Sequence, residues 1–243
     1  MTTEKFIKIK THDGKLIAAT QRGSFSKPVI VIVHGLAGNM NEALHFNAAR
    51  YFEHQGFSSL RVNLYHWQQG YRKLHECTFS THGKDIDTVL KYLAKHGAKR
   101  IFLVGHSFGW PSILHTKERN FLAVAPWDGS RLPYNQKEFA KRSRSPKGRI
   151  IDEGYWVIMG DRMAEDSHRV NSIGLVSKFE RPISFITVDD NVFGNWNNNK
   201  KMHQAARVKK ELVVIRGAHH TFSEEGKQEE LYAATVKWFK RFI

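Results

Sequence analysis

Residues 101–109 read IFLVGHSFG, a short apolar run that leads directly into the pattern G-x-S-x-G. The run predicts a strand buried on both faces, and a segment of helical pattern follows it. A serine at so sharp a strand-to-helix turn has a strained backbone, and side chains two residues before and after it would collide. Glycine is therefore needed at positions 105 and 109. This context predicts that Ser107 is a nucleophile at the end of a buried strand.

Strand and helix patterns alternate on both sides of this stretch. Continuous apolar runs are typical of strands that are buried on both faces of a parallel sheet. The alternation predicts an α/β fold with a mostly parallel, doubly wound sheet and helices on both faces. The strand patterns lie at 5–10, 16–22, 29–33, 58–63, 101–104, 121–126, 183–188 and 212–215, and the helical patterns lie at 41–55, 83–96 and 229–242.

The alternation breaks between about residues 127 and 180, where the sequence is long, basic and irregular. We expect a single domain over residues 1–243 with an inserted cap segment at about 127–180. Sites of open α/β sheets lie at the carboxyl ends of the strands, so such a segment could cover the site as a lid. Ordinary helices packed at the edge of the sheet are the alternative.

A serine nucleophile needs a base to take its proton and a carboxylate to orient that base. Where the serine follows a buried strand in this way, the carboxylate and then the histidine come later in the chain. Asp189 and Asp190 follow the strand pattern 183–188, and we favour Asp190 because the acid usually lies slightly beyond the strand. His219 and His220 follow the pattern 212–215, and one of them is expected to be the base.

The run 29–33 ends in His34, Gly35 and Leu36, and the glycines of this segment allow a tight loop close to the nucleophile. An oxyanion hole needs two backbone N–H groups that point at the carbonyl oxygen of the substrate. We expect these donors to be the amides of Leu36 and Phe108. His34 is interpreted as a buried structural residue that braces the loop.

Together these segments resemble the α/β-hydrolase superfamily, and in particular the group of serine aminopeptidases, monoacylglycerol lipases and feruloyl esterases. The resemblance is carried by the sequences HGL at 34–36, GHSFG at 105–109, TVDDNV at 187–192 and GAHH at 217–220, and it covers nearly the whole chain outside 127–180. It implies an α/β-hydrolase fold and a catalytic triad of Ser107, Asp190 and His220. Asp189 and His219 remain the alternatives.

The sequence departs from the group's pattern at two segments that can border the substrate pocket. Trp110 follows the last glycine of the motif, where a small residue is common, and residues 61–70 read RVNLYHWQQG. Tyr65, Trp67 and Trp110 are therefore expected either to line an aromatic pocket or to belong to the core.

The expected function is that of a serine-dependent acyl hydrolase that cleaves a carboxylic ester, with a small-molecule acyl compound as its partner. A thioesterase or a peptidase or amidase would use the same triad, and a non-catalytic binding protein of the same fold is a further alternative. We expect no cofactor and no metal ion, because no pair of histidines has the spacing of a zinc helix. The loose cluster of His75, Cys77 and His82 is interpreted as incidental.

The composition is ordinary for a globular protein: 41% of the 243 residues are hydrophobic and 25% are charged. The net charge is +15, and a basic run lies at 131–149. No nucleic-acid fold signature accompanies it, so nucleic acid is not the expected partner.

The sequence favours a cytoplasmic protein without a membrane span. It has one cysteine, no signal-peptide pattern and no apolar run of membrane length. The oligomeric state is not predicted.

Overall fold

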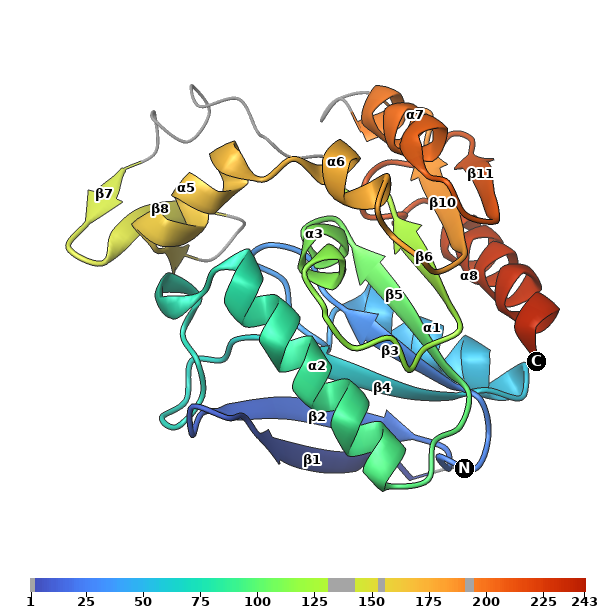
Figure 1. Cartoon of the computed structure of the whole chain (residues 1–243), viewed down its shortest axis with the longest axis horizontal. Coiled ribbons are helices and arrows are strands. Elements are labelled where there is room, and N and C mark those ends of the chain that lie inside the picture. Colours follow the sequence, from blue (N-terminus) through green and yellow to red (C-terminus); the bar gives the residue numbers. More distant parts are fainter. Residues whose placement is uncertain (1–2, 131–142, 153–155, 191–194) are drawn as a thin grey trace.

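The computed structural model describes residues 3–130, 143–152, 156–190 and 195–243, and its centre is an eight-stranded sheet (Figure 1). β2 is antiparallel to both of its neighbours, and all other neighbouring strands in this sheet are parallel. The predicted mostly parallel, doubly wound sheet is confirmed. In spatial order the strands are β1 (Lys5–Lys10), β2 (Leu16–Arg22), β4 (Ser58–Asn63), β3 (Val29–Val33), β5 (Ile101–His106), β6 (Ala123–Trp127), β10 (Ile183–Val188) and β11 (Lys210–Ile215).

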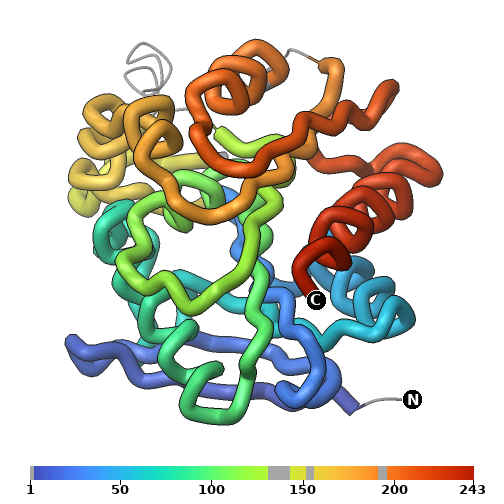
Figure 2. The backbone as a smooth tube through the Cα atoms, turned by 45° about the vertical axis from the view of Figure 1, so that its right-hand side comes forward, coloured from blue at the N-terminus to red at the C-terminus, as the bar shows by residue number. Residues whose placement is uncertain are grey.

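Helices cover both faces of the sheet, and each face has its own apolar core. Helices α1 (Ala43–His54) and α8 (Lys227–Phe239) pack side by side on one face, as Figure 2 shows. The other face carries α2 (Phe79–Lys95), α3 (Gly109–Leu114), α6 (Ser172–Val176) and α7 (Asn195–Ala205). The short helix η1 (Leu74–Glu76) precedes α2, and η2 (Lys240–Phe242) directly follows α8. The central strands are buried on both faces because helices cover both sides.

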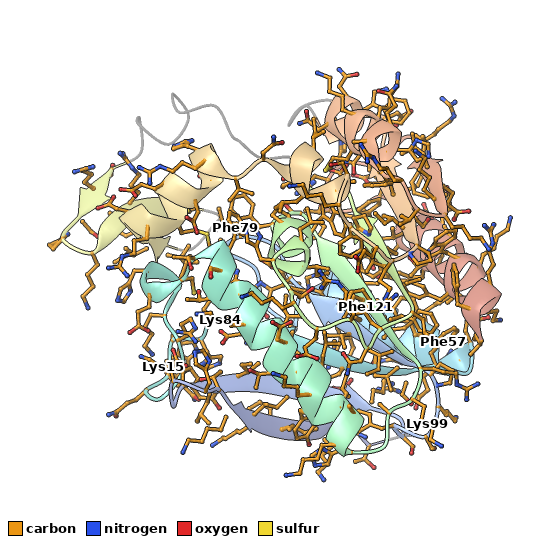
Figure 3. The ribbon with its side chains drawn as sticks, in the orientation of Figure 1. Lys15, Phe57, Phe79, Lys84, Lys99 and Phe121 are labelled. Atoms are coloured by element: carbon orange, nitrogen blue, oxygen red, sulfur yellow. The ribbon has the colours of Figure 1, made fainter. Side chains whose placement is uncertain are left out.

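Helix α2 begins four residues before its predicted start at Gly83. The hydroxyl of Thr78 accepts a hydrogen bond from the backbone N–H of Thr81, so Thr78 caps the helix. The first helical residue, Phe79, is fully buried and lies at the end of α2 that faces the inserted segment (Figure 3). Tertiary packing and this cap extend the helix beyond its amphipathic stretch.

In its described residues, the segment between β6 and β10 forms a small antiparallel sheet and the helices α5 and α6. The sheet consists of β7 (Arg144–Ser145), β8 (Gly148–Asp152) and β9 (Trp156–Met159), and α5 (Asp161–Arg169) follows it. The backbone N–H of Phe79, in α2, donates to the Asp166 carboxylate at 3.2 Å. This contact joins α5 to the main layers. Of the basic run at 131–149, residues 131–142 lie outside the described residues.

Over the residues that the structure describes, no helix has both the length and the apolar character that crossing a membrane requires.

Candidate active site

The turn after β5 holds Ser107 at the carboxyl edge of the sheet. The φ angle of Ser107 is +51°, in the left-handed region that non-glycine residues rarely adopt. A Cβ atom at position 105 would lie 2.8 Å from the carbonyl carbon of Gly109, and one at position 109 would lie 2.5 Å from the carbonyl oxygen of Val33. Both distances are shorter than a carbon atom tolerates, so glycine is required at both positions.

The loop after β11 brings a histidine to a buried carboxylate. Nδ1 of His220 lies 2.5 Å from Oδ2 of Asp128, the residue that follows β6. The Asp128 side chain is 1% exposed and that of His220 is 19% exposed. A buried carboxylate at Nδ1 fixes the orientation of the imidazole and leaves Nε2 as the nitrogen that can accept a proton.

The carboxylate at Nδ1 of His220 is thus not Asp190, which the sequence favoured. The Asp190 carboxylate lies 2.7 Å from Nδ1 of the neighbouring His219, and the His219 side chain is 68% exposed. This hydrogen bond raises the pKa of His219 above its ordinary value. Oδ1 of Asp189 accepts a hydrogen bond from the backbone N–H of Gly217 at 2.9 Å. This contact holds the start of the loop after β11. The two adjacent histidines therefore have different carboxylate partners.

Asp128 is held in place by contacts on its other side. Its Oδ1 accepts a hydrogen bond of 2.6 Å from the Thr187 hydroxyl in β10, and its backbone N–H donates to the carbonyl oxygen of Ile186. Asn199, from α7, donates from Nδ2 to the Thr187 hydroxyl oxygen and to the carbonyl oxygen of Gly129. These partners hold a buried carboxylate that would otherwise be costly to desolvate.

Asp128 is not among the residues predicted from the sequence, because the chain from about residue 127 has the pattern of an irregular insertion. A local signal was present: Asp128 and Gly129 directly follow an apolar strand, as Asp189 and Asp190 do. The φ angle of Asp128 is +41°, so the chain turns sharply at this residue. The turn directs the carboxylate back toward the loop after β11.

Backbone hydrogen bonds join the serine turn to the segment that carries Asp128. The N–H of Ser107 donates to the carbonyl oxygen of Trp127 at 3.1 Å, and the N–H of Ser130 donates to the carbonyl oxygen of Ser107 at 3.1 Å. The hydroxyl oxygens of Ser107 and Ser130 are also 3.1 Å apart. His106, next to the serine, packs against the His220 ring with 4.8 Å between centroids. Ser107 is therefore joined to the segment that carries Asp128, and His220 contacts both Asp128 and the residue next to the serine.

The loop after β3 lies beside the serine. A Cβ atom at Gly35 would be 3.2 Å from Cβ of Ser107, so the absence of a side chain there permits the close approach. Nδ1 of His34 donates to the carbonyl oxygen of Gly35, and Nε2 accepts from the backbone N–H of Leu64. The predicted oxyanion residues, Leu36 and Phe108, follow Gly35 and Ser107 in the chain. Phe108 belongs to the apolar cluster under the inserted segment, and Leu36 packs against that cluster.

Buried imidazoles surround the site in their neutral form. Burial lowers the pKa of His34 to about 4 and that of His106 to about 3. For His106, repulsion from the His220 imidazole when that ring is protonated adds to this effect. Nε2 of His106 donates to the carbonyl oxygen of His220 at 3.0 Å. His34 and His106 thus position the two loops.

Strained backbone conformations cluster at this edge of the sheet. Within the described ranges, the non-glycine residues with positive φ are Ala37, Ser107, Asp128 and Phe222. They follow β3, β5, β6 and β11 respectively. Such strain persists where the surrounding structure enforces it, and it is concentrated at functional sites.

The aromatic residues singled out in the sequence have different positions. Trp110 is fully buried in the core between α3 and the sheet, whereas Trp67 is 80% exposed. Tyr65 is partly buried, and its hydroxyl donates to the carbonyl oxygen of Gly35. Cys77 is buried, and among the described residues no three His, Cys, Asp or Glu side chains are grouped so as to hold a metal ion.

No protein-family model and no curated protein matches this chain, but solved structures match it over nearly its whole length. Est1E from Butyrivibrio proteoclasticus with bound ferulic acid is 17% identical, with a TM-score of 0.81 over 97% of this chain and 98% of that one. The α/β hydrolase GrgF from Penicillium sp. is 12% identical, with a TM-score of 0.80 over 99% of both chains.

A dienelactone hydrolase from Anabaena variabilis is also 12% identical, with a TM-score of 0.71 over 100% of this chain and 99% of that one. At such identities a structural likeness establishes the fold. The chain therefore has the α/β-hydrolase fold, as the sequence resemblance implied.

Proposed function

We propose that this chain is a serine hydrolase that cleaves a carboxylic ester through an acyl-enzyme. Ser107 is the nucleophile, His220 is the base, and Asp128 takes the place that the sequence assigned to Asp190. The observation that carries the proposal is the buried pair of Asp128 and His220 beside a serine with a strained backbone. A serine nucleophile, an imidazole and a buried carboxylate are the groups that acyl transfer requires.

The reaction has two halves. In the first, Nε2 of His220 takes the proton from Oγ of Ser107 as Oγ forms a bond to the carbonyl carbon. The electron pair of the C=O bond moves onto oxygen, which accepts hydrogen bonds from the amides of Leu36 and Phe108. The tetrahedral intermediate then expels the alcohol, which His220 protonates. In the second half, water repeats these steps on the acyl-enzyme and releases the acid.

Ester substrates are favoured by what the structural neighbours are named for. Est1E was solved with ferulic acid, and a carboxylic acid is what hydrolysis of an ester releases. Another neighbour is a dienelactone hydrolase, and a lactone is a cyclic ester. Thioesters, and the amides of a peptidase or amidase, would react through the same steps with a different leaving group. A small-molecule acyl compound is thus the proposed partner.

We also propose that the inserted segment at about 127–180 is a cap over the acyl site. Buried apolar side chains from this segment, Ile151 and Met163, belong to the same cluster as Phe108, and Leu36 packs against that cluster. An acyl group bound at the two amides would therefore lie next to apolar cap residues. Movement of the cap as a lid is a prediction of this arrangement.

A fluorophosphonate probe tests the catalytic proposal directly, because it labels activated serines. The wild-type protein should be labelled, and the Ser107→Ala variant should not. A panel of p-nitrophenyl esters of graded length, compared with thioesters and aminoacyl amides, then identifies the acyl group and the leaving group. If the folded wild-type protein is not labelled, the chain is instead a non-catalytic binding protein of this fold.

A further inference from the structure

We propose that Ser130 is a second catalytic hydroxyl, which donates a hydrogen bond to Oγ of Ser107 while that oxygen reacts. The inference rests on the proposed serine-hydrolase function. The two hydroxyl oxygens are 3.1 Å apart, and the Ser130 side chain is fully buried. Ser130 was not among the residues selected from the sequence, and it lies two positions after Asp128.

The turn that brings Asp128 to His220 also places Ser130. Asp128 has a positive φ angle, and Gly129 follows it in contact with the Trp110 ring. A Cβ atom at position 129 would lie 2.8 Å from the indole Cδ1 atom, so a residue with a side chain does not fit. The backbone N–H of Ser130 then donates to the carbonyl oxygen of Ser107. The main chain therefore places Ser130 beside the nucleophile.

The direction of the hydrogen bond follows from the proposed reaction. The Ser107 proton must pass to Nε2 of His220, so in the reactive state Ser107 cannot also donate to Ser130. Oγ of Ser107 instead accepts the proton of the Ser130 hydroxyl. As Oγ loses its own proton it gains negative charge, and a hydrogen bond to a charged oxygen is stronger than one to a neutral oxygen.

Ser130 acts again in the second half of the reaction. When the acyl-enzyme is hydrolysed, Oγ of Ser107 leaves with the electron pair of the ester bond and regains a proton from His220. The Ser130 hydroxyl stabilises the charge on Oγ until that proton arrives, and it keeps its own proton throughout. Loss of one hydrogen bond to a charged group should slow the reaction roughly ten- to hundred-fold.

A hydrogen bond in the other direction, from Ser107 to Ser130, would give the opposite effect of the substitution on the rate. If Ser107 donates to Ser130 in the resting enzyme, the hydrogen bond holds the nucleophile away from its base. Removal of the Ser130 hydroxyl would then raise the rate of labelling and of turnover. The effect of a single substitution on the rate therefore distinguishes the two directions of the hydrogen bond.

The experiment compares Ser130→Ala with the wild-type protein and with Ser184→Ala. Ser184 is also fully buried, and its hydroxyl donates to Glu211 in the neighbouring strand β11. The rate of fluorophosphonate labelling and the kcat and KM on p-nitrophenyl butyrate are measured for each. We expect Ser130→Ala to lower the labelling rate and kcat roughly ten- to hundred-fold with an unchanged KM. Ser184→Ala should match the wild type.

A second pair of variants separates the effect of the Ser130 hydroxyl on the rate from the effect of side-chain packing. Ser130→Thr and Ser130→Val have nearly the same shape, and the threonine retains a hydroxyl. We expect the threonine variant to react at least several times faster than the valine variant. This comparison remains valid if Ser130→Ala does not fold. Equal rates for this pair, or wild-type labelling by folded Ser130→Ala, overturn the role of Ser130. Labelling of the wild type that does not depend on Ser107 instead overturns the proposed function.

Discussion

Nδ1 of His220 lies 2.5 Å from Oδ2 of Asp128, a carboxylate 92 residues earlier in the chain. Because the Asp128 side chain is buried, water cannot compete for the carboxylate, and its charge acts strongly on the imidazole. The adjacent histidine forms a similar contact of 2.7 Å with Asp190, but in solvent. The chain thus has two neighbouring His–Asp pairs, of which the buried one is the proposed catalytic pair.

Asparagine substitutions at the two carboxylates compare these pairs. We expect Asp128→Asn to lower kcat on a p-nitrophenyl ester by about 10³–10⁴-fold, because an amide group favours the wrong imidazole tautomer. Asp190→Asn should keep kcat within a few-fold of the wild type, because its partner His219 is exposed. Near-ultraviolet circular dichroism checks that both variants are folded. A large loss in Asp190→Asn together with a small loss in Asp128→Asn would restore the assignment made from the sequence.

Alanine substitutions at the histidines make an independent comparison. His220→Ala removes the proposed base and should lower kcat by several orders of magnitude while the fold is retained. His219→Ala removes a side chain that is 68% exposed, and it should change both kcat and the melting temperature only slightly. The two kcat values, measured on one ester, show which of the two histidines is the base. Near-normal turnover in His220→Ala would move the base to position 219.

The fold and the serine turn could be predicted because their signals are local. The five buried residues of β3 are a continuous apolar run, and two glycines flank Ser107 at the spacing that the turn requires. The acid could not be chosen in this way. Asp128 and Asp190 each follow a parallel strand, and β6 and β10 are neighbours in the sheet. Which carboxylate meets His220 depends on the turn after each strand, and that is a tertiary property.

Ser130 and Thr187 could not be predicted from the sequence either, because their contacts are also tertiary. A serine after Asp-Gly and a threonine inside a strand have no distinctive pattern. Their roles follow from the neighbours that the fold supplies. Thr187 faces Asp128 because β10 lies next to β6, and Ser130 faces Ser107 because β6 lies next to β5.

Thr187→Val tests the support of the buried carboxylate. Valine has nearly the shape of threonine but lacks the hydroxyl that donates to Oδ1 of Asp128 at 2.6 Å. A buried group that loses a hydrogen-bond partner costs about 1–3 kcal/mol. We expect a decrease of this size in the free energy of unfolding, measured by urea denaturation, and a several-fold lower kcat. Thr20→Val, in β2, is the matched control, and an equal loss of kcat in both variants would refute the role of Thr187.

Buried neutral histidines should make the protein less stable in weak acid. Burial lowers the pKa of His82 to about 3, and that of His106 is also about 3. An unfolded histidine has a pKa of about 6.5. Between pH 6.5 and 3 the unfolded chain therefore binds more protons, and the free energy of unfolding falls as the pH falls. At pH 5 each such histidine lowers it by about 2 kcal/mol relative to pH 8.

His82→Gln isolates one of these contributions without touching the proposed catalytic groups. Urea denaturation at pH 8 and pH 5 gives the loss of stability for the wild type and for the variant. Because glutamine does not titrate in this range, the loss should be smaller by about 2 kcal/mol in the variant. His219→Ala is the control with the opposite sign, because the pKa of His219 is raised and its contribution is lost as the pH rises. An unchanged loss in His82→Gln would mean that His82 is protonated in the folded protein at pH 5.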